Sequence, residues 1–362
     1  MAAHIKKVVV DSYRGIKNLE LDGLGKVNIF LGDNNVGKTS LLEVIQLLCN
    51  PCEYNLINVA RQRENKTIFV RTGLRNLDAL KYMFDIYSDC RSNNYYFMRI
   101  AGDINDKCGQ IDVVGNVVSQ LVDMTDERYR GLRDKIELSE HGEVEMFIGE
   151  IKETFNNTNI HVEIDNFKRI TRIVDKELLK CSFVKTIDYM VQNPINAIVR
   201  NKNIKSIAVE LLKNFDEDIT DIRYISDNGE RYIPVVDICD KEYMPLSMYG
   251  DGMRKVLTMI NAMAYTENGV VLIDEFENGI HTSVMNIAFK FMLKLAEKLN
   301  IQLFLTTHSI EAVDKILEIS KENSDDLRVI RLRKKNRKIF PKIMTGEEAL
   351  NDRQEYGMEL RV

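Results

Sequence analysis

The residues GDNNVGKTS, from Gly32 to Ser40, decide how the rest of this 362-residue chain is arranged. They match the pattern G-x-x-x-x-G-K-[ST] between an apolar run at 26–31 and a helical run at 41–49. The two glycines allow backbone angles that turn successive N–H groups toward an anion at the start of a helix. Lys38 adds a charge for the β- and γ-phosphates, and Thr39 adds a hydroxyl for Mg²⁺. We therefore predict a triphosphate-binding loop made of Gly32, Asp33, Asn34, Asn35, Val36, Gly37, Lys38, Thr39 and Ser40.

A second motif, VVLIDEFENGIH at 270–281, is an apolar strand that ends in two acids. The carboxyl edge of a parallel sheet is where such side chains lie beside bound phosphate. We expect Asp274 to hold Mg²⁺ and Glu275 to orient and deprotonate the attacking water. An exposed acidic turn is the alternative, and an intact phosphate loop elsewhere in the chain makes it the weaker one.

Two further motifs stand at the ends of predicted elements. IQLFLTTHS at 301–309 is a buried strand ending at His308, which we expect to contact the γ-phosphate or the attacking water; a structural histidine is the alternative. SMYGDGMRKVL at 247–257 places Gly250, Asp251 and Gly252 before a helix. We expect this loop to offer N–H groups to a nucleotide bound by a second subunit, and an ordinary glycine turn is the alternative.

Together, the four motifs resemble the ABC-type heads of the RecF, SMC and OLD-like ATPases of the AAA family. The resemblance is closest to small bacterial members encoded with phage-defence or toxin partners. It implies that GDNNVGKT is Walker A, LIDE is Walker B, TTHS carries the switch histidine and YGDGMRKVL is the signature loop. The opening DSYRGIKNLEL resembles the family's first hairpin, which adds Arg14 to the expected nucleotide site, and the segment through Gly357, Glu359 and Arg361 resembles the usual ending.

The chain also departs from that family pattern. Gly250 stands where the family has a serine, so the loop loses a hydroxyl for contacts across a dimer. The Q-loop glutamine is left open between Gln46 and Gln62. Few residues follow Arg333, and the acidic cluster at 216–218 has the composition of an exposed turn. We therefore expect no TOPRIM-type nuclease domain in this chain.

The pattern of strands and helices predicts an α/β fold. The resemblance makes it an ABC-type P-loop ATPase head, with a mixed sheet flanked by helices, an antiparallel β lobe and a helical insertion. We expect the core at 1–50 and 219–362, a β-rich lobe with helical insertions at 51–188, and a helical segment at 189–218. Within the lobe, strands are predicted at 67–71, 94–100, 110–118 and 159–165, and helices at 74–87 and 127–155.

Composition limits the partners. A formal net charge of −5 and a pI near 5.7 give no overall basic field, so nucleic acid would need a local patch. The candidate is the basic run Arg331, Arg333, Lys334, Lys335, Arg337 and Lys338, for which a strand pair with a charged turn is the favoured interpretation. Scattered cysteines and the lack of a signal or membrane-spanning segment predict a cytoplasmic protein that does not contact membranes.

The resulting hypothesis is an ATP- and Mg²⁺-dependent switch that dimerises head-to-head and controls a separately encoded effector, a nuclease or toxin, in phage defence. A nucleotide-gated scaffold with little hydrolysis and a RecF-like DNA-repair ATPase are the alternatives. A GTPase is disfavoured because no N-K-x-D motif is present. A small-molecule kinase would explain neither the signature-like loop nor His308.

Overall fold

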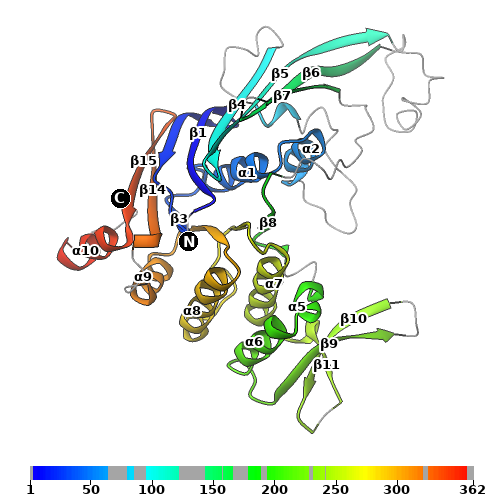
Figure 1. Cartoon of the computed structure of the whole chain (residues 1–362), viewed down its shortest axis with the longest axis vertical. Coiled ribbons are helices and arrows are strands. Elements are labelled where there is room, and N and C mark those ends of the chain that lie inside the picture. The colour runs from blue at the N-terminus through cyan, green and yellow to red at the C-terminus, as the bar shows by residue number, and fades with distance from the viewer. Residues whose placement is uncertain are drawn as a thin grey trace.

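A computed structural model describes most of the chain (Figure 1). The described residues are 3–63, 80–84, 95–121, 143–156, 158–165, 178–188, 194–227, 231–240, 242–320 and 325–356. The predicted strand at 67–71, the parts of the predicted helices at 74–79, 85–87 and 127–142, and the family-like ending at 357–362 lie outside these ranges.

The core is a six-stranded sheet in the order β15-β14-β3-β13-β12-β8. Its strands are β3 (Val27–Leu31), β8 (Cys181–Val184), β12 (Val270–Ile273), β13 (Gln302–Thr307), β14 (Leu327–Lys335) and β15 (Lys338–Thr345). All pairs are parallel except β14 with β15. Every residue of β12 and β13 is buried, as expected for parallel strands covered on both faces. The mixed sheet predicted from sequence is confirmed.

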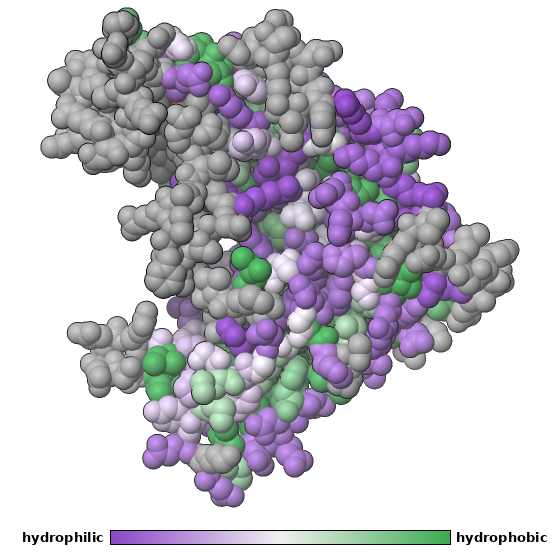
Figure 2. All heavy atoms as spheres, turned by 180° about the vertical axis from the view of Figure 1, so that it is seen from behind, coloured by the Kyte–Doolittle hydropathy of each residue, from purple (hydrophilic) through white to green (hydrophobic). Residues whose placement is uncertain are grey.

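Helices cover this sheet on both faces. One face packs against α1 (Lys38–Cys49), and the other packs against α7 (Asp251–Tyr265), α8 (Thr282–Lys298) and α9 (Ile310–Ile319). Along β12, Val270 and Leu272 belong to the first core and Val271 and Ile273 to the second. The last described helix, α10 (Gly346–Tyr356), packs beside α9 and β14. Figure 2 shows a mainly hydrophilic surface at the edge where β14 and β15 lie.

A second six-stranded sheet is antiparallel, in the order β2-β1-β4-β5-β6-β7, and lies across α1 from the core sheet (Figure 1). Its strands are β1 (Ile5–Tyr13), β2 (Ile16–Asp22), β4 (Tyr95–Ile104), β5 (Lys107–Leu121), β6 (Glu143–Phe155) and β7 (Thr158–Asp165). The predicted helix at 127–155 is wrong over 143–155, because this stretch pairs with a strand on each side. A short helix, α2 (Glu53–Arg61), follows α1.

Each of the two large sheets combines strands from more than one of the sequence ranges. The first two strands, expected with the ATPase core, join the antiparallel sheet, and β8, expected in the β lobe, pairs with β12. The helical segment contains α5 (Asn196–Arg200) and α6 (Lys202–Leu212), which pack against α7. A small sheet of β9 (Ile219–Asp227), β10 (Arg231–Ile238) and β11 (Met244–Pro245) leads to the 3₁₀ turn Leu246–Met248. The proposed domain limits themselves remain a prediction.

One buried amide joins the two large sheets. Gln302 is 1% exposed, and its side chain accepts a hydrogen bond from the backbone N–H of Ile5 (2.8 Å). The same side chain donates to the carbonyls of Ile5 (2.7 Å) and Gly25 (2.8 Å). Gln302 opens β13, Ile5 opens β1 and Gly25 precedes β3. A polar residue is retained here because it satisfies backbone groups that would otherwise be buried without partners.

Replacing Gln302 with Met keeps an unbranched side chain of similar volume and removes these bonds. We expect Gln302→Met to lower the free energy of unfolding by about 2 to 4 kcal/mol, because buried backbone groups lose their partners. Urea unfolding measures this. The matched control Lys298→Met, at an exposed position on α8, should change stability by no more than about 0.5 kcal/mol. Equal stability of the two variants would contradict the role of Gln302.

Candidate functional site

The phosphate loop is held tightly against its neighbours. A Cβ on Gly32 would lie 2.5 Å from the carbonyl oxygen of Leu332 in β14, so a larger residue would displace one of the two. Gly37, immediately before α1, has φ 103°, a conformation that side chains disfavour. Asn35, in the same loop, has φ 62°. The two glycines predicted from sequence are therefore required by close packing at one end and by backbone angle at the other.

Lys38 lies inside this loop and is only 7% exposed. Its Nζ donates to the carbonyl oxygens of Gly32 (2.5 Å) and Asp33 (2.9 Å). Burial lowers the pKa of Lys38, and the carboxylates of Asp274, Glu275 and Asp33 act in the opposite direction. The loop thus holds the partly desolvated ammonium group of Lys38 beside the position where a phosphate is expected to bind.

Oxygen ligands for a hard cation meet between two strand ends. Thr39 Oγ1 lies 3.2 and 3.1 Å from the two carboxylate oxygens of Asp274, and Thr306 Oγ1 donates to Asp274 Oδ1 at 2.6 Å. Burial raises the pKa of Asp274, while the bonds from Thr306 and Thr39 lower it. A hydroxyl and a carboxylate fit Mg²⁺, which keeps water and phosphate as its other ligands. No group of three or more His, Cys, Asp or Glu ligands occurs among the described residues.

Glu275 is fixed through its backbone and faces His308. Its N–H donates to Thr306 Oγ1 (2.8 Å), its carbonyl accepts from Lys255 Nζ (2.5 Å), and its φ is 49°. The carboxylate Oε1 lies 3.4 Å from His308 Nε2. The other ring nitrogen, Nδ1, is buried and has no hydrogen-bond partner within the described ranges. The left-handed backbone at Glu275 is a local strain of the kind that clusters at functional sites.

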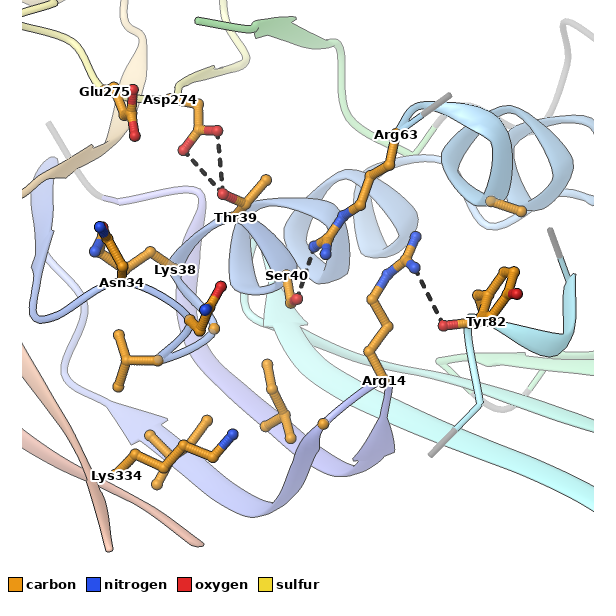
Figure 3. Close-up of a pocket in the computed structure, with 17 residues that line it drawn as sticks. Arg14, Asn34, Lys38, Thr39, Ser40, Arg63, Tyr82, Asp274, Glu275 and Lys334 are labelled. Carbon is orange, nitrogen blue, oxygen red and sulfur yellow. Dashed lines mark hydrogen bonds between the residues drawn. The ribbon is translucent and has the colours of Figure 1, made fainter. Parts of the chain in front are cut away.

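A cavity of about 720 Å³ adjoins these groups (Figure 3). Its lining includes Lys38, Thr39, Asp274 and Glu275. Figure 3 shows the phosphate loop and Lys334 on one side of the view, and Arg14 with Tyr82 on the other. The volume is in the range of small-molecule sites. The further lining residues are Gly15, Ile16, Asn34, Asn35, Val36, Gly37, Ser40, Ala60, Arg63 and Ile339.

Arg14 reaches the cavity as expected, as part of a network that the sequence did not predict. Glu43, 1% exposed on α1, accepts hydrogen bonds from Arg14 Nε (2.8 Å), Tyr13 OH (3.0 Å) and Arg63 Nε (2.8 Å). Arg63 Nη2 also donates to Ser40 Oγ (2.8 Å). A buried carboxylate of this kind requires cations. It holds two arginines at the edge of the nucleotide cavity.

Other expected site residues lie elsewhere. Gly250, Asp251 and Gly252 begin α7 and line neither the cavity nor the hollow of about 370 Å³ formed by Gly32, Asp33, Asn34, His308 and Ser309. Gln62 donates from Nε2 to Gln46 Oε1 (2.8 Å), and neither glutamine lines the cavity. Neither therefore reaches the nucleotide site in this conformation.

Lys255 is an additional site residue that the motif analysis did not single out. It is 0% exposed on α7, four residues after Asp251, and its Nζ donates a hydrogen bond to the Glu275 carbonyl. Burial lowers its pKa to about 8, although Glu277, Glu275 and Asp274 act to raise it. This lysine ties the helix that follows the signature-like loop to the residue expected to activate water.

Comparisons with known proteins agree with this geometry. The family model described as "AAA domain, putative AbiEii toxin, Type IV TA system" matches residues 196–314. An "ATP/GTP phosphatase" of Helicobacter pylori is 24% identical over 371 residues, covering 95% of this chain and 96% of that protein. A RecF DNA replication and repair protein of Listeria monocytogenes is 44% identical over 45 residues, 12% of each chain.

Among solved structures, an Smc head bound to the C-terminal winged-helix domain of ScpA aligns with a TM-score of 0.52. The alignment covers 96% of this chain and 100% of that one at 11% identity, and so concerns the fold. The four motifs, the two-sheet architecture and these similarities give one conclusion. The chain has the fold of an SMC-like, ABC-type ATPase head.

The buried position of Lys255 predicts an unusual pH dependence. A lysine whose pKa is about 8 when folded and 10.5 when unfolded binds fewer protons in the folded state between these values. The free energy of unfolding of the wild type, relative to Lys255→Met, should therefore rise by roughly 3 kcal/mol as the pH increases from about 8 to 10.5. Urea unfolding at several pH values measures the difference. Lys298→Met, at an exposed site, should follow the wild type; parallel curves for all three proteins would contradict the effect.

Proposed function

We propose that this chain hydrolyses ATP by in-line attack of water on the γ-phosphate. The observation that carries the proposal is the meeting of three strand ends, two at the main cavity and the third, with His308, at the neighbouring hollow that shares Asn34 with it. Lys38 and Thr39 follow β3, Asp274 and Glu275 follow β12, and His308 follows β13. The hydrogen bond from Thr39 to Asp274 and the 3.4 Å approach of His308 to Glu275 join the three ends.

Each group has a distinct part in this proposal. Lys38 and the N–H groups of the loop hold the phosphates, while Thr39 and Asp274 hold Mg²⁺. When bound, Mg²⁺ neutralises charge on the phosphates. Glu275 accepts the proton of the attacking water, and His308, whose Nε2 faces that carboxylate, contacts the water or the γ-phosphate. Arg14, at the far side of the cavity, contributes to nucleotide binding.

We further propose that ATP binding closes two copies of the chain head-to-head. Gly250 and Asp251 are exposed at the start of α7, away from the cavity of their own chain, as a loop that serves the partner's nucleotide needs to be. The backbone N–H groups there can meet an anion. Lys255 supports the proposal because it links this helix to Glu275, so closure and the position of the catalytic carboxylate are mechanically connected.

The switch would act on a separately encoded effector, a nuclease or a toxin, in defence against phage. Support comes from the toxin and toxin–antitoxin wording of the family model that matches 196–314. The energy of nucleotide binding is then converted into a change of shape that the effector senses. Co-purification of the chain from its native host, with and without ATP, tests for the effector.

The role of Glu275 predicts a separation of binding from turnover. Glu275→Gln should reduce steady-state phosphate release by at least about 100-fold and leave ATP binding intact, because only the proton acceptor is lost. Phosphate release and equilibrium binding of a fluorescent ATP analogue measure the two effects. Glu297→Gln, an exposed glutamate on α8, is the matched control. Unchanged turnover in Glu275→Gln removes the residue from this role, and bound ATP with scarcely any release in the wild type favours a nucleotide-gated scaffold.

The position of Gly250 provides a test of dimer closure. A Cβ at Gly250 would meet no atom within 4 Å, and its φ of −63° suits any residue, so Gly250→Arg should fold normally. We expect this variant, combined with Glu275→Gln, to bind ATP as a monomer, whereas Glu275→Gln alone dimerises with ATP. Light scattering distinguishes the two states. Gly250→Ala is the small-residue control, and ATP-dependent dimers of Gly250→Arg would contradict the proposed interface.

A further inference from the structure

The hairpin formed by β14 and β15 has two chemically different faces. Residues directly opposite one another in an antiparallel pair point to the same side, and successive pairs alternate sides. Leu332 pairs with Pro341 and Lys334 pairs with Ile339. The alternate pairs are Arg333 with Phe340 and Lys335 with Lys338. We call the side that carries Leu332, Lys334, Ile339 and Pro341 the inner face, and the opposite side the outer face.

The inner face belongs to the nucleotide site. Lys334 and Ile339 both line the cavity, and a Cβ on Gly37 would lie 3.2 Å from Ile339 Cδ1. Ile339 and Leu332 are also part of the core that contains α1. The inner face of the hairpin therefore packs against the cavity and the core that contains α1.

The outer face, defined by Arg333, Lys335, Lys338, Phe340 and Lys342, is basic and exposed. Within the described ranges, no carboxylate forms an ion pair with Arg333, Lys335 or Lys338, and Lys342 pairs with Asp352 at 3.0 Å. Phe340 is 53% exposed in the middle of these cations. Figure 2 shows hydrophilic residues gathered at this edge of the molecule. A chain with a formal net charge of −5 has thus gathered cations around an exposed aromatic ring.

The turn of the hairpin adds to this charge. Asn336 and Arg337 have φ values of 50° and 64°, as in the two-residue turns that favour Asn-Gly. An arginine in the second position occupies a left-handed conformation that glycine would adopt without strain. Local turn propensity therefore does not explain Arg337.

We propose that the outer face of the β14–β15 hairpin binds single-stranded nucleic acid. Side chains two residues apart on one face of a strand are about 7 Å apart, so the cations form short rows along which a phosphate backbone can lie. Phe340 supplies a flat apolar surface on which an unpaired base can stack. An acidic protein segment would use the cations and have no comparable use for the exposed ring. The unpaired bases of a single strand use both features.

The test measures fluorescence anisotropy of a labelled oligo(dT) of about 20 nucleotides with the full chain, without ATP. The triple variant Arg333→Gln, Lys335→Gln, Lys338→Gln should bind at least about 10-fold more weakly at low salt, and the slope of log affinity against log salt should fall by about 2. Its matched control removes three exposed lysines elsewhere: Lys202→Gln, Lys213→Gln, Lys294→Gln.

Stacking is tested separately from charge. Phe340→Ala should weaken binding about 5- to 100-fold, and Phe340→Trp should restore it, because base–aromatic stacking is lost and regained. Arg337→Gly should weaken binding, because it removes a cation from the tip of the hairpin. Equal loss in the control triple, an unchanged affinity in Phe340→Ala, or equally tight binding of labelled poly-glutamate would each overturn the proposal. Since ATP is absent, the result does not depend on the hydrolysis proposed above.

Discussion

The buried carboxylate of Asp274 is the point on which the site depends. It accepts hydrogen bonds from Thr39, at the start of α1, and from Thr306, on the neighbouring strand β13. Burial alone disfavours the charged form of this side chain, as its raised pKa indicates. Two hydroxyls from separate elements offset part of that cost only when β3, β12 and β13 lie in parallel register. The arrangement of oxygen atoms that suits Mg²⁺ therefore depends on the register of the core sheet.

The same constraint extends into the backbone of the next residue. Thr306 Oγ1 both donates to Asp274 and accepts from the N–H of Glu275, while Lys255 bonds the Glu275 carbonyl. Glu275 is thus positioned through its peptide groups, and its carboxylate stays available to face His308. A fully buried lysine on α7 is costly, and its retention is explained by what it connects. The Lys255 side chain thus joins α7 to the backbone of Glu275.

The sequence predicts those parts of the fold and of the site whose residues form a contiguous motif. The phosphate loop, LIDE and TTHS are contiguous, and their strand–loop–helix context follows from apolar runs and glycines, so the core fold was predicted. The composition of Glu143–Phe155 favours a helix, but pairing with a strand on each side makes it a strand. Gly149 in this strand has room for no side chain, since a Cβ would lie 2.5 Å from Val114 O.

Site residues without a motif could not be found in the same way. Arg63 lies 23 residues after Ser40 and Lys334 lies near the other end of the chain, and only the fold brings them to the cavity. For Glu43, a carboxylate on the apolar side of α1, the sequence did contain a signal, because a buried acid needs cations nearby. Arg14 was expected from family resemblance, and Glu43 supplies its physical reason: the ion pair at 2.8 Å fixes the guanidinium beside the cavity.

Under the two proposals above, the β14–β15 hairpin would contact two ligands. Lys334 faces the nucleotide cavity, and its neighbours Arg333 and Lys335 project to the opposite side because strand side chains alternate. A polyanion on the outer face and a nucleotide on the inner face would contact the same two strands. If the strands shift between two positions, each ligand changes the affinity for the other by the same factor. Because the carbonyl of Leu332 in β14 packs closely against Gly32, such a shift would also move the phosphate loop.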